Sequence, residues 1–475
     1  MASKMEYKPI PPSPHRFRPR VIIHGGAGNI TPETLPPDLY SQYRESLLTI
    51  ITKTHDYMFS HDDNHYQPSS LSTATYAVTL LEDNPLFNAG HGAVFTRDGY
   101  NELEASIMVS HPGSYPKRGV GVAGLRHVRN PILLAKAILE HGQDDLLGKP
   151  SQHTAPPVQN QNMLDVPSAQ GHTLIHGLAA EQLAKQYGLD LVPQSYFYTQ
   201  KRWEEHTRAL DREKNNPEKN LATYSTEEYL PQGTVGAVTV DAQGIITVAT
   251  STGGLTNKLT GRIGDTPSVG AGFWAEEWAE EGDPSGYAEL RCQRGPAVVI
   301  SDALKGLMAD CLPTPFKYTP VYQTLKLMTT RSMAVSGTGN GDSFLRTAAA
   351  RTVGAMARFG RISTKEAVAR VAGPGGELEK SAGDRWGLTG EGAGGIIGIE
   401  AVEVQDEKGE LIDMRCEILQ DFNCGGMFRA WIDSRSHAHF RVWHQDGSTP
   451  VGYGSEDIFG IDLRKAATKG EAISF

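Results

Sequence analysis

The sequence predicts an α+β protein. Its 475 residues, 39% of them hydrophobic, suit one large or two ordinary globular domains. Strand-like runs precede helical patterns, and the same order starts again after a charged stretch that ends near residue 233. This order is compatible with two sheets packed between helical layers, although the pattern alone leaves other arrangements open.

The first half begins with a short β-branched strand at 21–23, which runs into a glycine-rich turn. Apolar residues at helical spacing predict helices over 39–59 and 176–188. The stretch 72–110 begins as a helix, passes through a Gly/Asn turn and continues as alternating strand segments, and a further helix is expected within 126–142.

The second half repeats the order from strands to helices and adds further strands. The predicted ranges are strands at 234–241 and 244–250, helices at 343–359 and 363–372, and strands at 392–404, 414–422 and 439–444.

Three segments are expected to lie outside the folded core. Residues 1–19 are basic and proline-rich, and we interpret them as a flexible N-terminal extension. Residues 142–170 are polar and contain prolines, as in a surface insertion. Residues 205–233 are highly charged and poor in apolar side chains, which is typical of a mobile linker.

Composition excludes several classes of protein. The formal charge of −10 gives no basic footprint for nucleic acid. The apolar runs are too short to span a bilayer, so we expect no membrane partner. The N-terminus lacks the apolar segment of a signal peptide, and the four cysteines show no disulfide framework. We therefore expect a cytoplasmic protein.

Thr234 is the first candidate for chemistry. It follows Gly233 at the border between the charged stretch and a predicted buried strand. If the bond between them is cut, the new α-amine of the threonine can serve as base for its own hydroxyl. Glycine suits the residue before the cut because it tolerates a distorted backbone. The plain alternative is a loop that feeds a strand.

A glycine-punctuated loop at 250–267 contains the second group of candidates. Thr252 ends a predicted strand, and Arg262 and Asp265 follow three residues apart. A guanidinium can bind a carboxylate in bidentate fashion, and a carboxylate can bind an ammonium group. Together they describe a receptor for an α-amino acid, and the alternative is an ion pair that stabilises a turn.

The stretch SGTGNGD at 336–342 leads directly into a predicted helix. Free backbone N–H groups at this position could bind an oxyanion, with the Thr338 hydroxyl as a further donor, or else a phosphate. The chain contains no P-loop motif, no third glycine of a dinucleotide-binding turn after residue 24, and no HExxH metal motif.

Taken together, these motifs resemble the plant-type asparaginase and isoaspartyl peptidase family of N-terminal-nucleophile hydrolases. The matching stretches, in family order, are HGGAGN, LEDNPLFNAGHGAVFTRDG, RHVRNPILLAKAILE, AAEQLAKQYGLDLVPQSYFYTQKRWEE, GTVGAVTVD, TSTGGLTNKLTGRIGDTPSVGAG and SGTGNGD. The resemblance covers about two thirds of the chain and implies a four-layer αββα sandwich. It also implies hydrolysis of L-asparagine to aspartate and ammonia, of isoaspartyl dipeptides, or of both, with no required cofactor.

The resemblance assigns the cleavage chemistry to the start of the second half. Thr234 matches the family nucleophile, released by autocatalytic cleavage after Gly233, and Thr252 matches the threonine that hydrogen-bonds its hydroxyl. Asn88 matches an asparagine near the nucleophile. The product would be an α part, 20–233, and a β part, 234–475, which together form a single domain.

The substrate-binding roles follow in the same way. Arg262 matches the residue that binds the substrate α-carboxylate, and Asp265 matches the one that binds its α-ammonium group. Thr338 and Gly339 match the oxyanion hole, while Gly341 matches a backbone group that contacts the substrate.

The resemblance also implies partners beyond the substrate. The family suggests a homodimer of αβ units, and its bacterial and plant members wrap a sodium ion in a loop of backbone carbonyls. The residues implied here for such a structural sodium ion are Leu81, Glu82, Asn84, Phe87, Ala89 and His91.

Two departures from the family pattern bear on substrate preference. Residues 275–332 appear as a second insertion beside the expected substrate site, and Asn340 and Asp342 stand where the family commonly has Thr and Glu. A glycosylasparaginase-like amidase is one alternative function, although such enzymes usually carry Thr-Asn-Gly where this chain has Thr252-Gly253-Gly254. A non-catalytic relative that acts as a binding protein is the other alternative.

Overall fold

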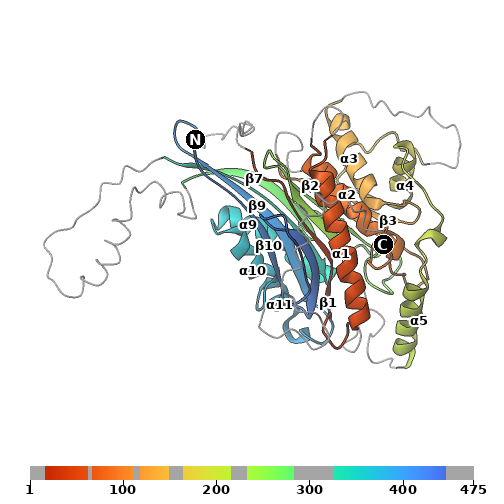
Figure 1. Ribbon diagram of the computed structural model, residues 1–475. Coiled ribbons are helices and arrows are strands. Elements are labelled where there is room, and N and C mark those ends of the chain that lie inside the picture. The colour runs from red at the N-terminus through yellow and green to blue at the C-terminus, as the bar shows by residue number, and fades with distance from the viewer. Residues whose placement is uncertain are drawn as a thin grey trace, which may run out of the picture.

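The computed structural model describes residues 16–61, 67–111, 118–148, 164–215, 233–282 and 326–444. Within these ranges the chain combines helices with two β-sheets, which confirms the α+β prediction (Figure 1).

The larger sheet has eight strands in the order β12-β11-β1-β5-β6-β2-β3-β4. Its strands are β1 (Arg20–Gly28), β2 (Leu103–Val109), β3 (Gly119–Leu125), β4 (Leu174–His176), β5 (Val235–Val240), β6 (Ile246–Thr252), β11 (Gly426–Ile432) and β12 (Ala438–Arg441). Neighbouring strands run antiparallel except β3 and β4, which are parallel. Strands β1 and β5 are neighbours, so the sheet joins the two halves of the sequence.

The smaller sheet has four antiparallel strands in the order β10-β9-β8-β7. Its strands are β7 (Phe273–Glu281), β8 (Met328–Gly339), β9 (Gly394–Gln405) and β10 (Leu411–Phe422).

The helices fall into two groups on opposite sides of the sheets (Figure 1). The first group is α1 (Pro37–Met58), α2 (Ser70–Glu82), α3 (Pro131–Leu146), α4 (Gly177–Gln186) and α5 (Gln200–Asn215), and the second is α8 (Gly341–Thr347), α9 (Ala349–Phe359), α10 (Thr364–Ala372) and α11 (Glu377–Ala382). Three short 3₁₀ turns are η1 (Gly90–Gly92), η2 (Gln194–Phe197) and η3 (Gly383–Arg385).

Apolar cores fill the spaces between these elements. Helices α1–α4 pack on one face of the larger sheet, and α8–α11 pack on one face of the smaller sheet. Between the sheets, Ile22 and Val248 of the larger sheet share a core with Phe273 and Ile399 of the smaller one. Successive residues of β1 alternate between two of these cores, as a strand with both faces buried requires.

Strand β1 is longer than predicted. It continues from the β-branched residues through the glycines to Gly28, with a register shift between His24 and Gly26 where it pairs with β11. The expected turn is therefore a bulged part of the strand. Similarly, the single helix predicted over 343–359 is broken at Ala348, whose φ of 45° ends α8 and starts α9.

The prediction of a mobile linker over 205–233 is wrong for the first part of that range. Residues up to Asn215 belong to α5, and the linker residues 216–232 lie outside the described ranges. The charges of α5 are partly buried rather than solvated, since the Arg202 guanidinium, 1% exposed, pairs with Glu205 at 2.9 Å. A charged sequence thus concealed a helix that packs on the protein.

The insertion predicted over 275–332 is likewise too long. Its first residues belong to β7 and its last to β8, which pair along their length with Phe273 opposite Ser336. The acidic side chains of β7 obscure its strand pattern in the sequence. In the structure Glu276 is paired, since its carboxylate lies 3.0 Å from the Arg358 guanidinium. Residues 283–325 lie outside the described ranges.

The other two peripheral segments are also shorter than predicted. The insertion assigned to 142–170 overlaps α3 at its start and contains the buried Ala169 near its end, while 149–163 lie outside the described ranges. Of the extension 1–19, Phe17 is buried and its N–H donates to the Ala242 carbonyl at 2.9 Å, whereas residues 1–15 are not described.

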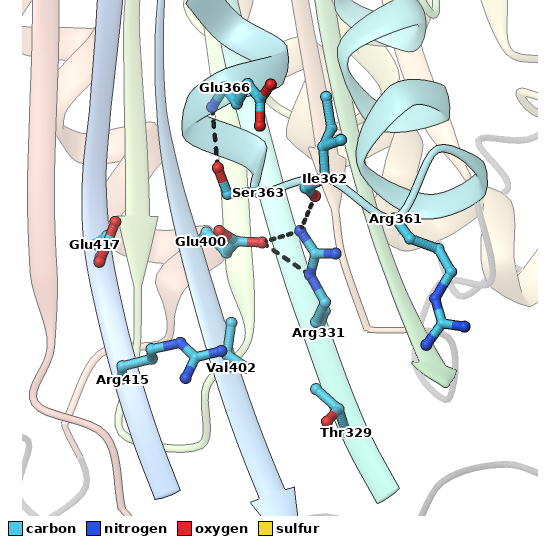
Figure 2. Close-up of a pocket in the computed structure, with 10 residues that line it drawn as sticks. All are labelled: Thr329, Arg331, Arg361, Ile362, Ser363, Glu366, Glu400, Val402, Arg415 and Glu417. Atoms are coloured by element: carbon cyan, nitrogen blue, oxygen red, sulfur yellow. Dashed lines mark hydrogen bonds and ion pairs between the residues drawn. The ribbon is translucent and has the colours of Figure 1, made fainter. Parts of the chain in front are cut away.

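A buried arginine attaches the second helical layer to the smaller sheet. The Arg331 guanidinium on β8 donates to the Glu400 carboxylate on β9 at 2.6 and 3.0 Å, and to the Ile362 carbonyl at 2.8 Å (Figure 2). Ile362 lies in the turn between α9 and α10, so these bonds fix that turn against the sheet. The same residues line a surface pocket.

We expect the substitution Arg331→Met to lower the urea midpoint of unfolding markedly. It leaves the buried Glu400 carboxylate without its cation, a loss that typically costs about 3–5 kcal/mol. The control is Arg370→Met, which breaks the exposed pair with Glu366, a kind of pair worth below about 1 kcal/mol. Adding Glu400→Met to Arg331→Met should recover part of the loss, and equal midpoints for all variants would contradict a structural role for the pair.

Candidate active site

The first residues of the second half lie at the end of a hairpin. Strands β5 and β6 pair antiparallel with Val235 opposite Ser251. Thr234, which precedes β5, therefore lies beside Thr252, the last residue of β6. Both threonines are buried, at 4% and 2% exposure.

A narrow pocket opens at this place, beside the end of β8. The described residues that line it are Glu104, Thr234, Thr252, Gly254, Leu255, Arg262, Gly264, Asp265, Thr266, Gly339 and Gly341. Of the predicted nucleophile, oxyanion and substrate residues, those missing from this lining are Gly233, Thr338 and Asn88. Residues from three distant parts of the sequence, around 104, 234–266 and 339–341, are thus brought into one site by the pairing of β2 with β6 and by the packing of the two sheets.

The hydroxyl of Thr234 has a partner that the sequence did not reveal. Its Oγ1 lies 2.8 Å from Oγ1 of Thr266. The expected contact with Thr252 is not among the hydrogen bonds of the described residues, and the Thr252 hydroxyl instead accepts from the Gly254 N–H at 2.9 Å. The position of Thr266 directly after Asp265 was the only signal for it in the sequence.

Gly233, the residue before the proposed cut, is packed against Gly26 of β1. A Cβ added to Gly233 would lie 2.3 Å from the Cα of Gly26. Gly26 itself has a φ of +120°, which side chains rarely adopt. The backbone approach at this point therefore requires glycine on both sides.

The imidazole of His24 is a poor proton acceptor in this structure. Burial lowers the pKa of His24 to about 3, with a smaller opposing effect from the backbone of Thr234. Its Nε2 lies 2.7 Å from the Ser336 hydroxyl, and Gly236 makes room for both because a Cβ there would lie 2.4 Å from the ring. A base for the Thr234 hydroxyl must therefore come from another group.

Arg262 and Asp265 lie together at the far wall of the pocket. Asp265 is buried, and its Oδ2 has no hydrogen-bond partner among the described residues. Burial raises the pKa of Asp265 to about 7, an effect that the positive charge of Arg262 opposes. A Cβ on Gly341 would lie 2.5 Å from Asp265 Oδ1 and 3.1 Å from Arg262 Nη2, so glycine keeps the space between the two charges open.

Arg262 is already paired in the uncut chain. Its Nη2 lies 3.1 Å from a carboxylate oxygen of Asp342 in the first turn of α8. The pair is partly exposed, with 18% of the arginine side chain and 54% of the aspartate side chain accessible. A ligand carboxylate would therefore compete with Asp342 for the same guanidinium.

A buried ion pair that the sequence analysis missed supports this wall. Glu104 on β2 accepts from the Gly264 N–H at 3.2 Å, and Lys258 Nζ lies 3.6 Å from its carboxylate. Lys258 also donates to the Glu102 carbonyl at 3.0 Å. Burial lowers the pKa of Lys258, while Glu104 raises it. The alternation of charged and apolar residues in 102–105 was the available signal, but alternation alone does not distinguish a solvent-facing charge from a buried one.

The predicted oxyanion hole lies at the end of β8. The Thr338 hydroxyl is fully buried and has no hydrogen-bond partner among the described residues. Gly339 has a φ of +138°, and a Cβ there would lie 2.4 Å from the Ala393 carbonyl oxygen. The predicted helix start is present, because the Asn340 side chain accepts from the Ser343 N–H at 3.0 Å and caps α8.

Asn88 holds the turn after β6 rather than the pocket itself. Its Nδ2 donates to the Gly254 carbonyl at 2.7 Å, and its own carbonyl accepts from the Gly253 N–H at 3.0 Å. The Val94 N–H donates to its Oδ1 at 3.0 Å. Asn88 thus positions the strand end that carries Thr252.

The loop proposed to hold sodium is wound tightly around its carbonyl oxygens. A Cβ on Gly90 would lie 2.4 Å from the Glu82 carbonyl oxygen, and one on Gly92 would lie 2.2 Å from that of Phe87. The glycines therefore let two of the predicted ligand carbonyls approach the turn closely.

Three further properties of the described ranges concern metal sites, membrane spans and cysteines. Across them, no group of three or more His, Cys, Asp or Glu side chains is arranged to hold a metal ion. None of their helices combines the length and apolar character needed to cross a bilayer. Cys416 and Cys424 carry free thiols.

Comparison with known proteins identifies the family. The sequence model of the family described as Asparaginase matches residues 17–168 and 156–280. The chain belongs to this asparaginase family. The matched ranges include Gly233, Thr234 and the Arg262–Asp265 loop.

Several curated relatives of this asparaginase-family chain match along most of its length. It is similar to the isoaspartyl peptidase of Escherichia coli, with 31% identity over 429 residues that cover 90% of this chain and 97% of the relative. A putative isoaspartyl peptidase/L-asparaginase of Dictyostelium discoideum is 29% identical over 437 residues, 87% of this chain and 92% of the relative. A plant-type L-asparaginase of Pyrococcus furiosus is 34% identical over 262 residues, 54% of this chain and 71% of the relative.

Proposed function

We propose that this protein is an autoprocessing amidohydrolase with a threonine nucleophile, which hydrolyses L-asparagine, isoaspartyl peptides or both. The observation that carries the proposal is the shared pocket of Thr234, Gly339, Arg262 and Asp265. A hydroxyl, an oxyanion donor and a receptor for an α-amino acid are thereby combined. The names of the relatives, isoaspartyl peptidase and L-asparaginase, support the same activity.

The first step uses the amine that cleavage after Gly233 releases. The α-amine of Thr234 accepts the proton of its hydroxyl, and Oγ1 forms a bond to the side-chain amide carbon of the substrate. The weakly basic His24 leaves the amine as the better acceptor. The C–N bond of the amide then breaks, and the leaving nitrogen takes the proton from the α-ammonium group of Thr234.

The second step removes the acyl group. Water adds to the ester formed on Thr234, the ester bond breaks, and aspartate leaves while the hydroxyl regains its proton. In both steps the negative oxygen is held by the Thr338 hydroxyl and the Gly339 N–H. One such donor is typically worth about 3 kcal/mol of barrier. The unpartnered Thr338 hydroxyl is consistent with this role because it has no competing partner in the described part of the chain.

The charged side chains of Arg262 and Asp265 select the substrate. Arg262 binds the α-carboxylate, and Asp265 binds the α-ammonium group through its unpartnered oxygen. The carboxylate of Asp342 must be displaced from Arg262 when a substrate binds. Asparagine and isoaspartyl peptides present the same α-amino acid end to this wall, so it does not separate them.

Three further features belong to this proposal. The sheet and helix arrangement supports a four-layer αββα sandwich of the N-terminal-nucleophile type, in which the cleaved α part, 20–233, and β part, 234–475, stay together. A homodimer of αβ units and a cytoplasmic location stay predictions. So does a structural sodium ion, which backbone carbonyls of the 81–91 loop would hold.

We predict that Thr234→Ala leaves a single uncut chain near 51.6 kDa that releases no ammonia from asparagine. Alanine lacks the hydroxyl needed for both self-cleavage and catalysis. Thr234→Ser is the matched control, since it keeps the hydroxyl and should still be cut. Denaturing electrophoresis and an ammonia assay check both. If the alanine variant still splits, Thr234 is not the nucleophile of cleavage.

The pH dependence of kcat/KM should contain a rise centred near pH 7. Asp265 binds an ammonium group only when ionised, and its pKa is raised to about 7, so activity should increase as pH rises through that value. Asp342 contributes to raising this pKa. Asp342→Asn should therefore shift this rise to lower pH. The α-amine of Thr234, with an ordinary pKa of about 7.7–8.0, should give a second rise at higher pH, which Asp342→Asn shifts less.

The control for the pH experiment is Asp211→Asn, which removes an exposed carboxylate on α5. Its pH profile should overlay that of the wild type. A profile for Asp342→Asn that also overlays the wild type would contradict the assignment of the lower rise to Asp265.

The sodium proposal is tested by thermal unfolding at constant ionic strength. Replacing sodium chloride stepwise with choline chloride should lower the melting temperature, because an ion that binds only the folded chain stabilises it by RT ln(1 + c/Kd), where c is the ion concentration. The same series in potassium chloride tests selectivity. A melting temperature that depends on ionic strength alone would exclude a specific ion.

A further inference from the structure

A second pocket adjoins the active site and shares Gly339 with it. It lies between the ends of β1 and β8 on one side and loop 383–393, which leads from α11 to β9, on the other. Asn340, Trp386 and Asn423 form part of its wall. A group attached to a carbonyl held at Gly339 therefore has this pocket next to it.

The pocket is far larger than ammonia requires. Its volume is about 190 Å³, whereas a molecule the size of water needs about 10–15 Å³ on the same scale. When free asparagine is hydrolysed, the leaving group is only ammonia, and such a space stays unused. Hydrolysis of an isoaspartyl peptide releases an amine that carries a side chain, and such a group could fill it.

The walls of the pocket are mainly uncharged. Trp386 is half-buried and offers an aromatic surface, and burial raises the pKa of the Cys424 thiol to about 11, which keeps it neutral. The one carboxylate in the lining, Glu391, is bound by Arg385 at 2.9 Å and by Arg346 at 2.8 Å. These hydrogen bonds lower the pKa of Glu391 and compensate its charge.

Asn340 supplies a hydrogen-bond donor. Its Oδ1 accepts from the N–H and the hydroxyl of Ser343, at 3.0 and 2.8 Å. The Nδ2 of the same amide is consequently the group left for the pocket. It can donate to a carbonyl or carboxylate oxygen of the leaving residue.

We propose that this pocket binds the residue that follows isoaspartate in the substrate, and that it favours isoaspartyl peptides in which that residue is large and apolar. In this arrangement Trp386 packs against the side chain and Asn340 donates to the carboxyl group. The proposal rests on the proposed function, since it places the scissile carbonyl at Gly339.

The test compares kcat/KM for L-asparagine, β-aspartyl-glycine and β-aspartyl-phenylalanine on the fully cleaved enzyme. Wild type should prefer β-aspartyl-phenylalanine. Trp386→Ala should lower the ratio of β-aspartyl-phenylalanine to asparagine by about tenfold or more, the usual scale for loss of an apolar pocket contact. Trp386→Phe should recover most of that ratio. Leu388→Ala is the control, because Leu388 lies on the same loop, is 69% exposed and does not line the pocket.

A second variant tests the donor independently of the aromatic wall. Asn340→Asp keeps an acceptor for capping α8 but replaces Nδ2 with a charged oxygen. It should weaken hydrolysis of β-aspartyl-phenylalanine more than that of its C-terminal amide, because only the free acid has a carboxylate that the new negative charge repels.

The outcomes distinguish a failure of this inference from a failure of the proposed amidohydrolase function. If the cleaved wild type hydrolyses none of the substrates, the proposed function fails and this inference fails with it. If asparagine is hydrolysed and Trp386→Ala lowers all three substrates equally, or none, the function stands and the pocket assignment is overturned.

Discussion

The site depends on the apolar contact between the two sheets. Thr234 directly precedes β5 of the larger sheet, while Thr338 and Gly339 end β8 of the smaller one, so neither sheet alone supplies both the proposed nucleophile and the proposed oxyanion donors. The core that contains Ile22, Val248, Phe273 and Ile399 holds the two strand ends together. Because such cores are packed as densely as crystals, they fix distances between groups on opposite sheets more firmly than a loop could.

Glycine makes the approach of these strand ends possible. Gly233 and Gly26 touch backbone to backbone, Gly341 leaves space between Arg262 and Asp265, and Gly339 lies where a Cβ would strike a carbonyl oxygen. Each contact is specific to one position, so these glycines meet local steric requirements of the backbone rather than supply general flexibility.

Much of the site could be predicted from the sequence, because the relevant signals are local. The Gly233–Thr234 border, the spacing of Arg262 and Asp265, and the glycines before α8 are all short patterns. Thr266 and Glu104 could not be found in this way, since their contacts join segments far apart in the sequence: Thr266 reaches Thr234 through its side chain, and Glu104 lies on a strand that pairs with β6.

The errors in the fold have a related cause. Residues 205–215 of α5 were interpreted as part of a linker because their charges suggest solvent, yet Glu205 is buried and pairs at 2.9 Å with Arg202, which precedes the predicted linker. Parts of β7 and β8 were likewise assigned to an insertion, because the family-like motifs on either side of 275–332 lie far apart in the sequence. The acidic residues of β7 also hide its strand pattern. A charged residue indicates solvent only when no distant partner is available, and partners are a property of the tertiary structure.

The charges at the pocket wall suggest why a free α-amino acid end would be required of a substrate. Asp265 is buried with one carboxylate oxygen unpartnered among the described residues, close to the buried pair of Glu104 and Lys258. A substrate whose α-amine was acylated would desolvate Asp265 without supplying an ammonium group. An unsatisfied buried polar group costs about 1–3 kcal/mol, and a charged one more. An isoaspartyl linkage in the interior of a polypeptide would therefore be rejected by electrostatics, even where the backbone could reach Thr234.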